Sequence, residues 1–196
     1  MRHELEAERN NRLRWRFRFS LRILLLVTAL IAAFLAFLPP FYQFTPYDSH
    51  AELDEKFEFL GDKVEVWVIL EDGKSAPTFR QRWLIKKMLR YPAELKNSMC
   101  DAADQHRKDT EHSAGDLTLE YGLPRMNRYN IQEHFGIGVI WVPQLDGLSD
   151  DYLVLACDCT WEEEHGMHLI VKNGETVACR GEVDGQSAQK FLNAVN

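Results

Sequence analysis

A single uncharged apolar run, Ile23–Leu38, follows an N-terminal tail with seven arginines among its first 22 residues. Sixteen helical residues cover about 24 Å at about 1.5 Å each, and Leu21 and Phe41–Phe44 extend the run toward the roughly 30 Å of a bilayer core. Aromatic residues flank the run on both sides, as they do at membrane interfaces. The pattern predicts a transmembrane anchor over residues 23–44.

Two other interpretations of the apolar run stay open, a cleaved secretory signal and a buried core helix. A cleaved signal has a short basic region and small residues at its cleavage site. Here the basic region is about twenty residues long, and large residues (Phe34, Leu35, Phe37, Leu38) crowd that site. We therefore expect an uncleaved anchor in the cytoplasmic (inner) membrane. Because basic residues stay inside, the N-terminus should lie in the cytoplasm and the C-terminal domain outside it.

Charge separates the tail from the rest of the chain. The first 22 residues hold seven Arg and three Glu, so the remainder of this chain of net charge −7 carries about −11. An acidic domain without a second basic stripe argues against nucleic acid as a partner, because affinity for phosphates depends largely on Lys and Arg. The expected partners are therefore the lipid bilayer, through residues 23–44, and a protein that the sequence does not identify.

The sequence predicts four consecutive regions. Pro39 and Pro40 end the apolar helix, and the residues that follow turn polar. The roughly 150 residues after Asp48 suffice for one domain with its own core. The predicted regions are a basic cytoplasmic tail (1–22), a transmembrane anchor (23–44), a linker (45–56) and an extracytoplasmic domain (57–196).

The domain is expected to begin with a strand and two helices. Val64–Leu70 is β-branched and aromatic, and Glu71–Lys74 is typical of a hairpin turn. Thr78 is the predicted N-cap of a helix whose apolar residues recur at helical spacing up to Pro92. A second helix follows, and five residues share one of its faces: Leu95, Met99, Ala102, Ala103 and His106.

The C-terminal part has the patterns of β-strands. Gly138–Val142 predicts one strand, and Leu153–Trp161 alternates between two faces, with Trp161 expected to be buried on the face of Cys157 and Cys159. Met167–Val171 should pair with Glu175–Val183 through Asn173-Gly174, a strong hairpin signal. We expect this turn to be an exposed tip.

A short helix over Ser187–Val195 is expected to close the chain. The order of elements predicts an α+β fold: an N-terminal transmembrane helix plus one soluble domain, with an antiparallel sheet and two helices that cover one of its faces.

The four cysteines (Cys100, Cys157, Cys159, Cys179) allow two interpretations. Cys157 and Cys159 lie two apart on one strand face, which disfavours a bond between them, whereas either meets Cys179 across the hairpin sheet. Leu153, Leu155 and Trp161 share that face, so buried thiols are the default. A disulfide remains open, because an oxidising compartment permits it.

Candidate metal ligands cluster within 23 residues: Cys157, Cys159, His165, His168 and Cys179. A structural zinc ion is usually coordinated by four Cys or His side chains. However, the spacing C-x-C-x5-H-x2-H lacks the C-x2–4-C turn that brings two sulfurs to one ion. We therefore expect no metal, no other cofactor and no assigned catalytic residue.

An enzyme remains the alternative to a binding domain. The Glu162–His168 turn places three carboxylates beside His165, an acid–base candidate near neutral pH. No nucleophile is spaced with a base, and no G-x-S-x-G, glycine-rich phosphate loop or H-E-x-x-H occurs. We therefore expect a non-enzymatic binding or interaction domain, with a metal-assisted enzyme using this turn as the alternative. In the non-enzymatic case the turn is a structural corner in which Gly166 takes a positive φ.

Two short motifs resemble known groups of proteins. Arg16–Thr28 (RFRFSLRILLLVT) resembles the R-F-S-L-R-T-L-L-L anchor of hypothetical proteins from planctomycete-type bacteria. Trp161–Met167 (WEEEHGM), with Asn173-Gly174 after it, is similar to a W-D-x-E-H-G-L…N-G block that closes certain small bacterial α+β domains. In this block Glu162 replaces Asp and Met167 replaces Leu.

The second resemblance spans about Phe57–Val183. The domains that carry the block are of unknown function or resemble immunity proteins of polymorphic toxin systems. The resemblance therefore implies an α+β domain with a protein partner, and it implies no catalytic residues.

Overall fold

The computed structural model describes residues 23–35, 38, 42–70, 74–88, 90–91, 93–117, 122–144, 146–162, 166–181 and 192. The chain divides into two compact units, Met1–Pro39 and Pro40–Asn196. In the first unit, residues 23–35 are helical, and their large apolar side chains are exposed.

The predicted transmembrane helix over residues 23–44 is wrong. Among the described residues, no helix is both long enough and apolar enough to span a membrane. The physical reason is length: the described helical stretch of 13 residues covers about 20 Å, which falls short of a hydrocarbon core of roughly 30 Å.

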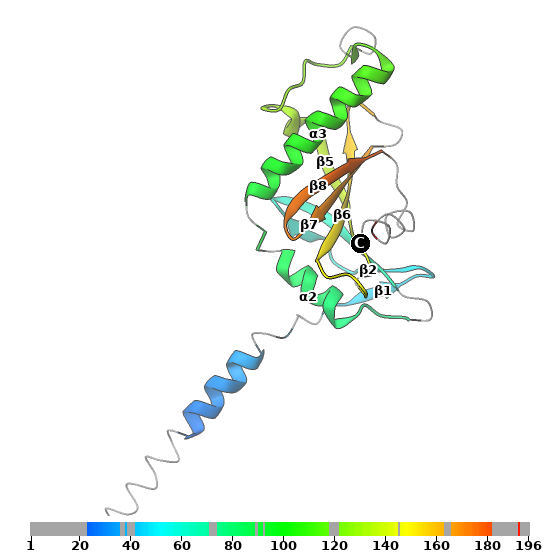
Figure 1. Cartoon of the computed structure of the whole chain (residues 1–196). Helices are drawn as coiled ribbons and strands as arrows, with labels where there is room; N and C mark the ends of the chain where they lie inside the picture. Colours follow the sequence, from blue (N-terminus) through cyan, green and yellow to red (C-terminus); the bar gives the residue numbers. More distant parts are fainter. Residues whose placement is uncertain are drawn as a thin grey trace, which may run out of the picture. The chain divides into compact units, whose positions relative to one another are not determined.

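The second unit is a sheet and the helices that connect two of its strands, β4 and β5, along the chain (Figure 1). Its elements, in chain order, are β1 (Phe44–Pro46), β2 (His50–Leu53), β3 (Phe57–Phe59), β4 (Asp62–Ile69), α2 (Phe79–Met88), α3 (Ala93–Ala114), the short 3-10 helix η1 (Ile131–Glu133), β5 (Phe135–Val142), β6 (Tyr152–Cys159), β7 (Met167–Lys172) and β8 (Glu175–Arg180). The predicted α+β class is confirmed for this unit.

The sheet is mixed, so the predicted antiparallel sheet is wrong. The strand order is β1-β2-β4-β5-β6-β7-β8, and β3 pairs with β4 off this path. β4 and β5 are parallel, with Trp67 opposite Trp141, whereas the other pairs are antiparallel. Parallel neighbours need a long crossover. Here the crossover contains α2, α3 and η1.

The segment 45–56, expected to be a linker, instead contributes strands to the sheet. β1 pairs with β2, and β2 pairs with β4, with His50 opposite Ile69. The amide of Leu70 also donates to the carbonyl of Ser49, at 3.1 Å. The polar composition suggested a linker, but short edge strands tolerate polar residues because only part of their surface is buried.

Helix α2 begins as predicted, with Thr78 at its N-cap. The Thr78 hydroxyl accepts from the amide of Gln81 at 3.3 Å, and the Gln81 side chain accepts from the amide of Thr78 at 2.9 Å. This reciprocal pair is a capping box. Gln81 is buried and donates to the carbonyls of Ile69 and Pro143. Its side chain thereby attaches the start of α2 to the ends of β4 and β5.

Helix α3 lies alongside β8 and covers one face of the sheet (Figure 1). That face carries Val66, Ile140, Leu155 and Leu169, which are opposite one another in register. The helices complete the core with buried side chains: Leu84, Ile85 and Met88 from α2, and Leu95, Met99 and Ala103 from α3.

The opposite face of the sheet is also buried at its centre, contrary to the expected one-sided cover. Tyr152–Leu155 in β6 and Met167–Val171 in β7 are continuously buried. Trp67 and Trp141 stack on this face, with ring centroids 6.4 Å apart, and Trp141 lies 5.4 Å from the ring of His168. Of the expected closing helix over Ser187–Val195, only Leu192 is described, and it is helical and buried.

The β7–β8 hairpin forms at Asn173-Gly174 as predicted, with φ of 52° and 92° at these residues. The expected exposed tip is confirmed at Asn173, whereas Gly174 is buried. Asn173 exchanges hydrogen bonds with the backbone of Asp151, and a Cβ on Gly174 would lie 3.4 Å from the ring of Tyr91. The hairpin end therefore packs against the segment that follows α2.

Candidate functional site

The three clustered cysteines lie on the sheet face beneath α3. Cys157 and Cys159 alternate with Ala156 and Asp158 in β6, and Cys179 of β8 is opposite Leu169 on the same face. All four cysteines of the chain are free thiols, so the disulfide alternative is not realised. Burial raises the pKa of Cys159 and of Cys179 to about 12 and also raises the pKa of Cys157. These thiols are therefore neutral and weakly nucleophilic at pH 7.

The structure does not bring His168 to these cysteines. His168 is opposite Ala156, so its ring lies on the other face of the sheet, against Trp141. His165, Glu163 and Glu164 lie outside the described residues. In the described part of the chain, no three His, Cys, Asp or Glu side chains are placed to hold a metal ion.

A different histidine, His106 of α3, lies beside the predicted turn. The indole N–H of Trp161 donates to Nδ1 of His106 at 3.1 Å, so Nδ1 is an acceptor and the ring proton is on Nε2. Nε2 lies 3.6 Å from a carboxylate oxygen of Glu162. Both ring nitrogens are therefore engaged, which removes His106 as a ready general base.

Sequence reasoning placed His106 on the buried face of its helix but did not connect it to Trp161. The two residues are 55 positions apart, so no local spacing could join them. The available signal was chemical: a partly buried histidine and a buried tryptophan each need a hydrogen-bond partner. Trp161 is only 5% exposed, which confirms its predicted burial.

Alongside His106, a groove of about 450 Å³ runs between α3 and β8. Its walls are six residues of α3 and four of β8: Ser98, Asp101, Ala102, Gln105, His106, Asp109, Thr176, Val177, Ala178 and Cys179. At one end, the Ser98 hydroxyl accepts from the amide of Thr176 at 3.1 Å. Ser98 of α3 thus satisfies the backbone N–H of Thr176 in β8, and this hydrogen bond connects the helix and the strand at that end of the groove.

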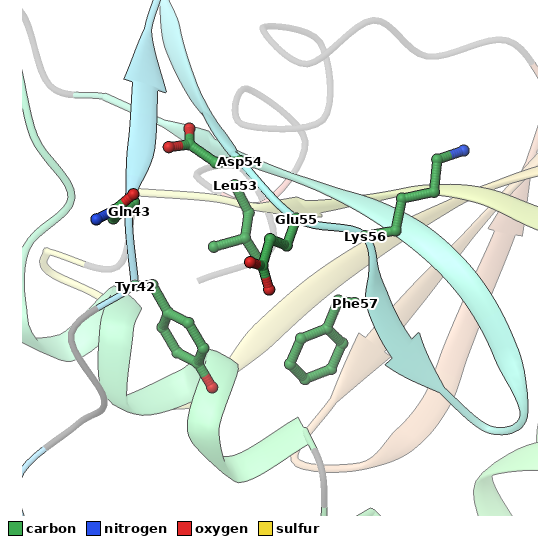
Figure 2. A pocket seen from close by; sticks show the side chains of 7 residues that line it. All are labelled: Tyr42, Gln43, Leu53, Asp54, Glu55, Lys56 and Phe57. Carbon is green, nitrogen blue, oxygen red and sulfur yellow. The ribbon is translucent and has the colours of Figure 1, made fainter.

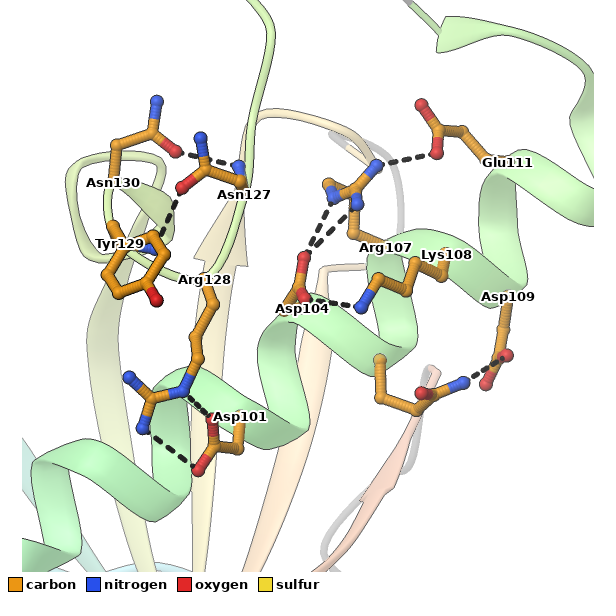
Figure 3. Close-up of polar contacts among 11 residues, drawn as sticks. Asp101, Asp104, Arg107, Lys108, Asp109, Glu111, Asn127, Arg128, Tyr129 and Asn130 are labelled. Atoms are coloured by element: carbon orange, nitrogen blue, oxygen red, sulfur yellow. Dashed lines mark hydrogen bonds and ion pairs between the residues drawn. The ribbon is translucent and has the colours of Figure 1, made fainter.

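The charged residues of the groove are carboxylates. The carboxylate of Asp101 pairs with the guanidinium of Arg128. The carboxylate of Asp109 accepts a hydrogen bond from the side-chain amide of Gln105 at 2.8 Å (Figure 3). Between them on α3, buried Asp104 and Arg107 form an ion pair that Lys108 and Glu111 extend. These ion pairs hold the charged side chains of α3 in place. Among the described residues, the groove is lined by no Lys or Arg.

Two other cavities lie on the second unit. One, of about 340 Å³, lies where β1 and β2 meet the approach to β3. Figure 2 shows the rings of Tyr42 and Phe57 beside the carboxylate of Glu55. The other, of about 400 Å³, lies at the end of α2 and is lined by cations and aromatic rings. The three cavities therefore differ in charge.

Stability should depend on pH through His106. Burial lowers the pKa of His106 below its ordinary value of 6.5, although Glu162 and Asp109 oppose the shift. The unfolded chain then binds this proton more readily than the folded chain. Stability is full above about pH 6.5 and falls as pH drops through the folded-state pKa.

Urea unfolding between about pH 5 and 7 measures this effect. We expect His106→Gln to flatten the rise of stability with pH in this window. An equal slope in wild type and His106→Gln would contradict the assignment.

Comparison with protein-family models matches residues 41–187 to a family described as a domain of unknown function, DUF6985. No curated protein matches the chain, and no solved structure does. The matched residues contain every element from β1 to β8.

Proposed function

The chain belongs to this DUF6985 family, and from that premise we propose that the domain is a non-enzymatic interaction module. It binds an extended segment of a partner protein in the groove between α3 and β8. The resemblance of the Trp161–Met167 block to immunity-like domains also favours a protein partner.

The position of β8 is the observation that carries the proposal. β8 is the last strand in the sheet order and pairs with β7 alone among the described strands. An edge strand presents backbone N–H and C=O groups that can pair with another chain. Recognition by strand addition uses such an edge, and pockets for alternate side chains supply specificity. Val177, at the middle of β8, is 53% exposed.

The groove has the shape and charge for a particular class of peptide. A helix wall and an edge strand enclose a volume of about 450 Å³. Two carboxylates, Asp101 and Asp109, lie on the helix wall, and Glu162 lies near His106. Opposite charges across an interface favour association and orient the partner. The proposed ligand is therefore an extended peptide with Lys or Arg side chains.

The chemistry beneath the groove supports binding over catalysis. The thiols of Cys159 and Cys179 are neutral because burial raises their pKa. His106 uses Nδ1 to hold Trp161 and faces Glu162 with Nε2. A nucleophile needs an adjacent base with a free lone pair, and these residues do not provide one.

Selection from a random peptide library on the full chain tests the proposal. Selected peptides should contain Lys or Arg at alternate positions, because only alternate side chains of a strand face the helix wall. Asp109→Lys should weaken a selected peptide at least about tenfold, since reversing a charge that contacts the peptide costs on the order of 1.4 kcal/mol or more.

Glu58→Lys makes the same charge change at the exposed position of β3 and is the matched control. It should leave affinity unchanged. Selected peptides without basic residues, or an affinity equal in Asp109→Lys and wild type, would overturn the groove assignment.

A further inference from the structure

His106 of α3 lies in the wall of the groove between α3 and β8 and contacts the corner that follows β6. We propose that protonation of His106 weakens the binding of a basic peptide in this groove, so that acidification releases the partner. This regulation rests on the proposed function of the groove. The contacts of the two ring nitrogens and the charges around the ring point to it.

Each ring nitrogen of His106 faces a different group of the corner. The indole N–H of Trp161 donates to Nδ1 at 3.1 Å, and a carboxylate oxygen of Glu162 lies 3.6 Å from Nε2. The first contact needs a lone pair on Nδ1, so it exists only while the ring is neutral. On protonation Nδ1 becomes a donor, and two N–H groups then face each other. The hydrogen bond that joins α3 to the corner is lost.

The loss of this hydrogen bond affects the shape of the groove. Trp161 is only 5% exposed, so little of its indole meets water, and a buried N–H without an acceptor is costly. The ring of His106 or that of Trp161 must therefore move when the imidazolium forms. Because His106 is itself a residue of the groove wall, either movement changes the surface that the peptide meets.

The titratable groups around His106 set the direction of the effect. Burial lowers the pKa of His106 below its ordinary value of 6.5, although Glu162 of the corner and Asp109 of α3 oppose the shift. From β6 and β8 the neighbouring groups are the thiols of Cys159 and Cys179, which burial keeps neutral at pH 7. The ring is therefore neutral at about pH 7.5 and takes up its proton as the pH falls through the acidic range.

An imidazolium at this position opposes a basic peptide through its charge as well. It places a positive charge in the same groove wall as the carboxylate of Asp109, and it forms an ion pair with Glu162, whose oxygen already faces Nε2. Both changes reduce the negative potential that attracts Lys and Arg side chains. Protonation and peptide binding therefore oppose each other, and by reciprocity the bound peptide lowers the pKa of His106 by the same factor.

Calorimetric titration of the full chain with a selected, histidine-free peptide at about pH 7.5 and about pH 5 tests the regulation. Wild type should bind at least about fivefold more weakly at the lower pH, the small end of typical coupling between two sites. His106→Gln should lose most of this difference, because glutamine keeps an amide beside Trp161 and gains no charge. Circular dichroism gives the folded fraction at each pH, so that the affinities refer to the folded chain.

His112→Gln is the matched control, because His112 is exposed on the same helix and lies outside the groove lining. It should keep the pH dependence of wild type. A second measurement needs no variant: NMR titration of the His106 ring, with and without peptide. The bound peptide should lower the midpoint by about 0.7 pH units, which is the same fivefold factor, and the indole N–H signal of Trp161 should shift over the same pH range.

The possible outcomes distinguish this regulation from peptide binding itself. A peptide that binds wild type equally at both pH values, or loses affinity equally in wild type and His106→Gln, overturns the role of His106 and leaves peptide binding in place. If His106→Gln does not fold, an unchanged midpoint of His106 on peptide addition overturns that role in the same way. If no peptide is selected, the proposed function fails, and the regulation by His106 fails with it.

Discussion

Trp161→Ala is expected to lower the free energy of unfolding by about 3–5 kcal/mol, the usual cost of removing a buried Trp. Trp161 is 5% exposed and follows β6 directly, beneath α3. Its indole N–H is also the donor that holds Nδ1 of His106. The substitution thus leaves a cavity and an unpaired acceptor in the same place, so this effect should be among the largest in the domain.

Trp161→Phe separates the two contributions. A smaller ring still fills much of the space, but His106 loses its donor, which alone costs on the order of 1 kcal/mol. Urea unfolding followed by circular dichroism measures both variants. An unchanged unfolding midpoint in Trp161→Ala would show that the ring does not support the core.

Gly166→Ala is expected to destabilise the domain by about 2–6 kcal/mol, because strain and overpacking each cost about 1–3 kcal/mol. Gly166 has a φ of +62°, in the left-handed region. A Cβ there would lie 2.5 Å from the carbonyl oxygen of Cys157. That oxygen belongs to the backbone of a central strand and cannot move without disturbing the sheet.

Gly181→Ala is the matched control for this change. A Cβ on Gly181 would meet no atom within 4 Å, so its effect should stay within about 0.5 kcal/mol. The same urea titration compares the two variants. Equal stability of Gly166→Ala and wild type would mean that the turn before β7 takes another conformation.

The glycine explains part of the W-E-E-E-H-G-M block. The amide of Gly166 donates to the carbonyl of Glu162 at 2.9 Å, which closes the corner between β6 and β7. The positive φ expected at this position is confirmed. The block therefore contains a structural requirement at Gly166 and at Trp161, whereas the role of His165 stays a prediction because it lies outside the described residues.

Individual elements of the domain were predicted correctly where the signal was local. The N-cap of α2 at Thr78 was predictable because a capping box lies within four consecutive residues. Asn173-Gly174 formed the last turn because both residues tolerate positive φ. The alternation in Leu153–Trp161 predicts one buried face for β6. This prediction is wrong for the first half of the strand, where both faces are buried up to Leu155.

Composition misled the interpretation in two places. The polar stretch 45–56 was assigned to a linker, yet β1 and β2 add to the sheet through backbone hydrogen bonds, which any side chain permits. The apolar run predicts a transmembrane helix, although no helix among the described residues is long and apolar enough to cross a membrane. Hydropathy alone does not give the length of a helix.

The sequence by itself determined where β4, α2, α3 and the strands from β5 to β8 lie, because periodicities of 2 and 3.6 residues and turn chemistry act over a few neighbouring positions. Only the tertiary structure decided that β4 and β5 are parallel and that His106 meets Trp161 across 55 positions. It also placed β8 at the edge of the sheet beside α3. These are contacts between distant segments, selected by the packing of the whole core, and no local pattern encodes them.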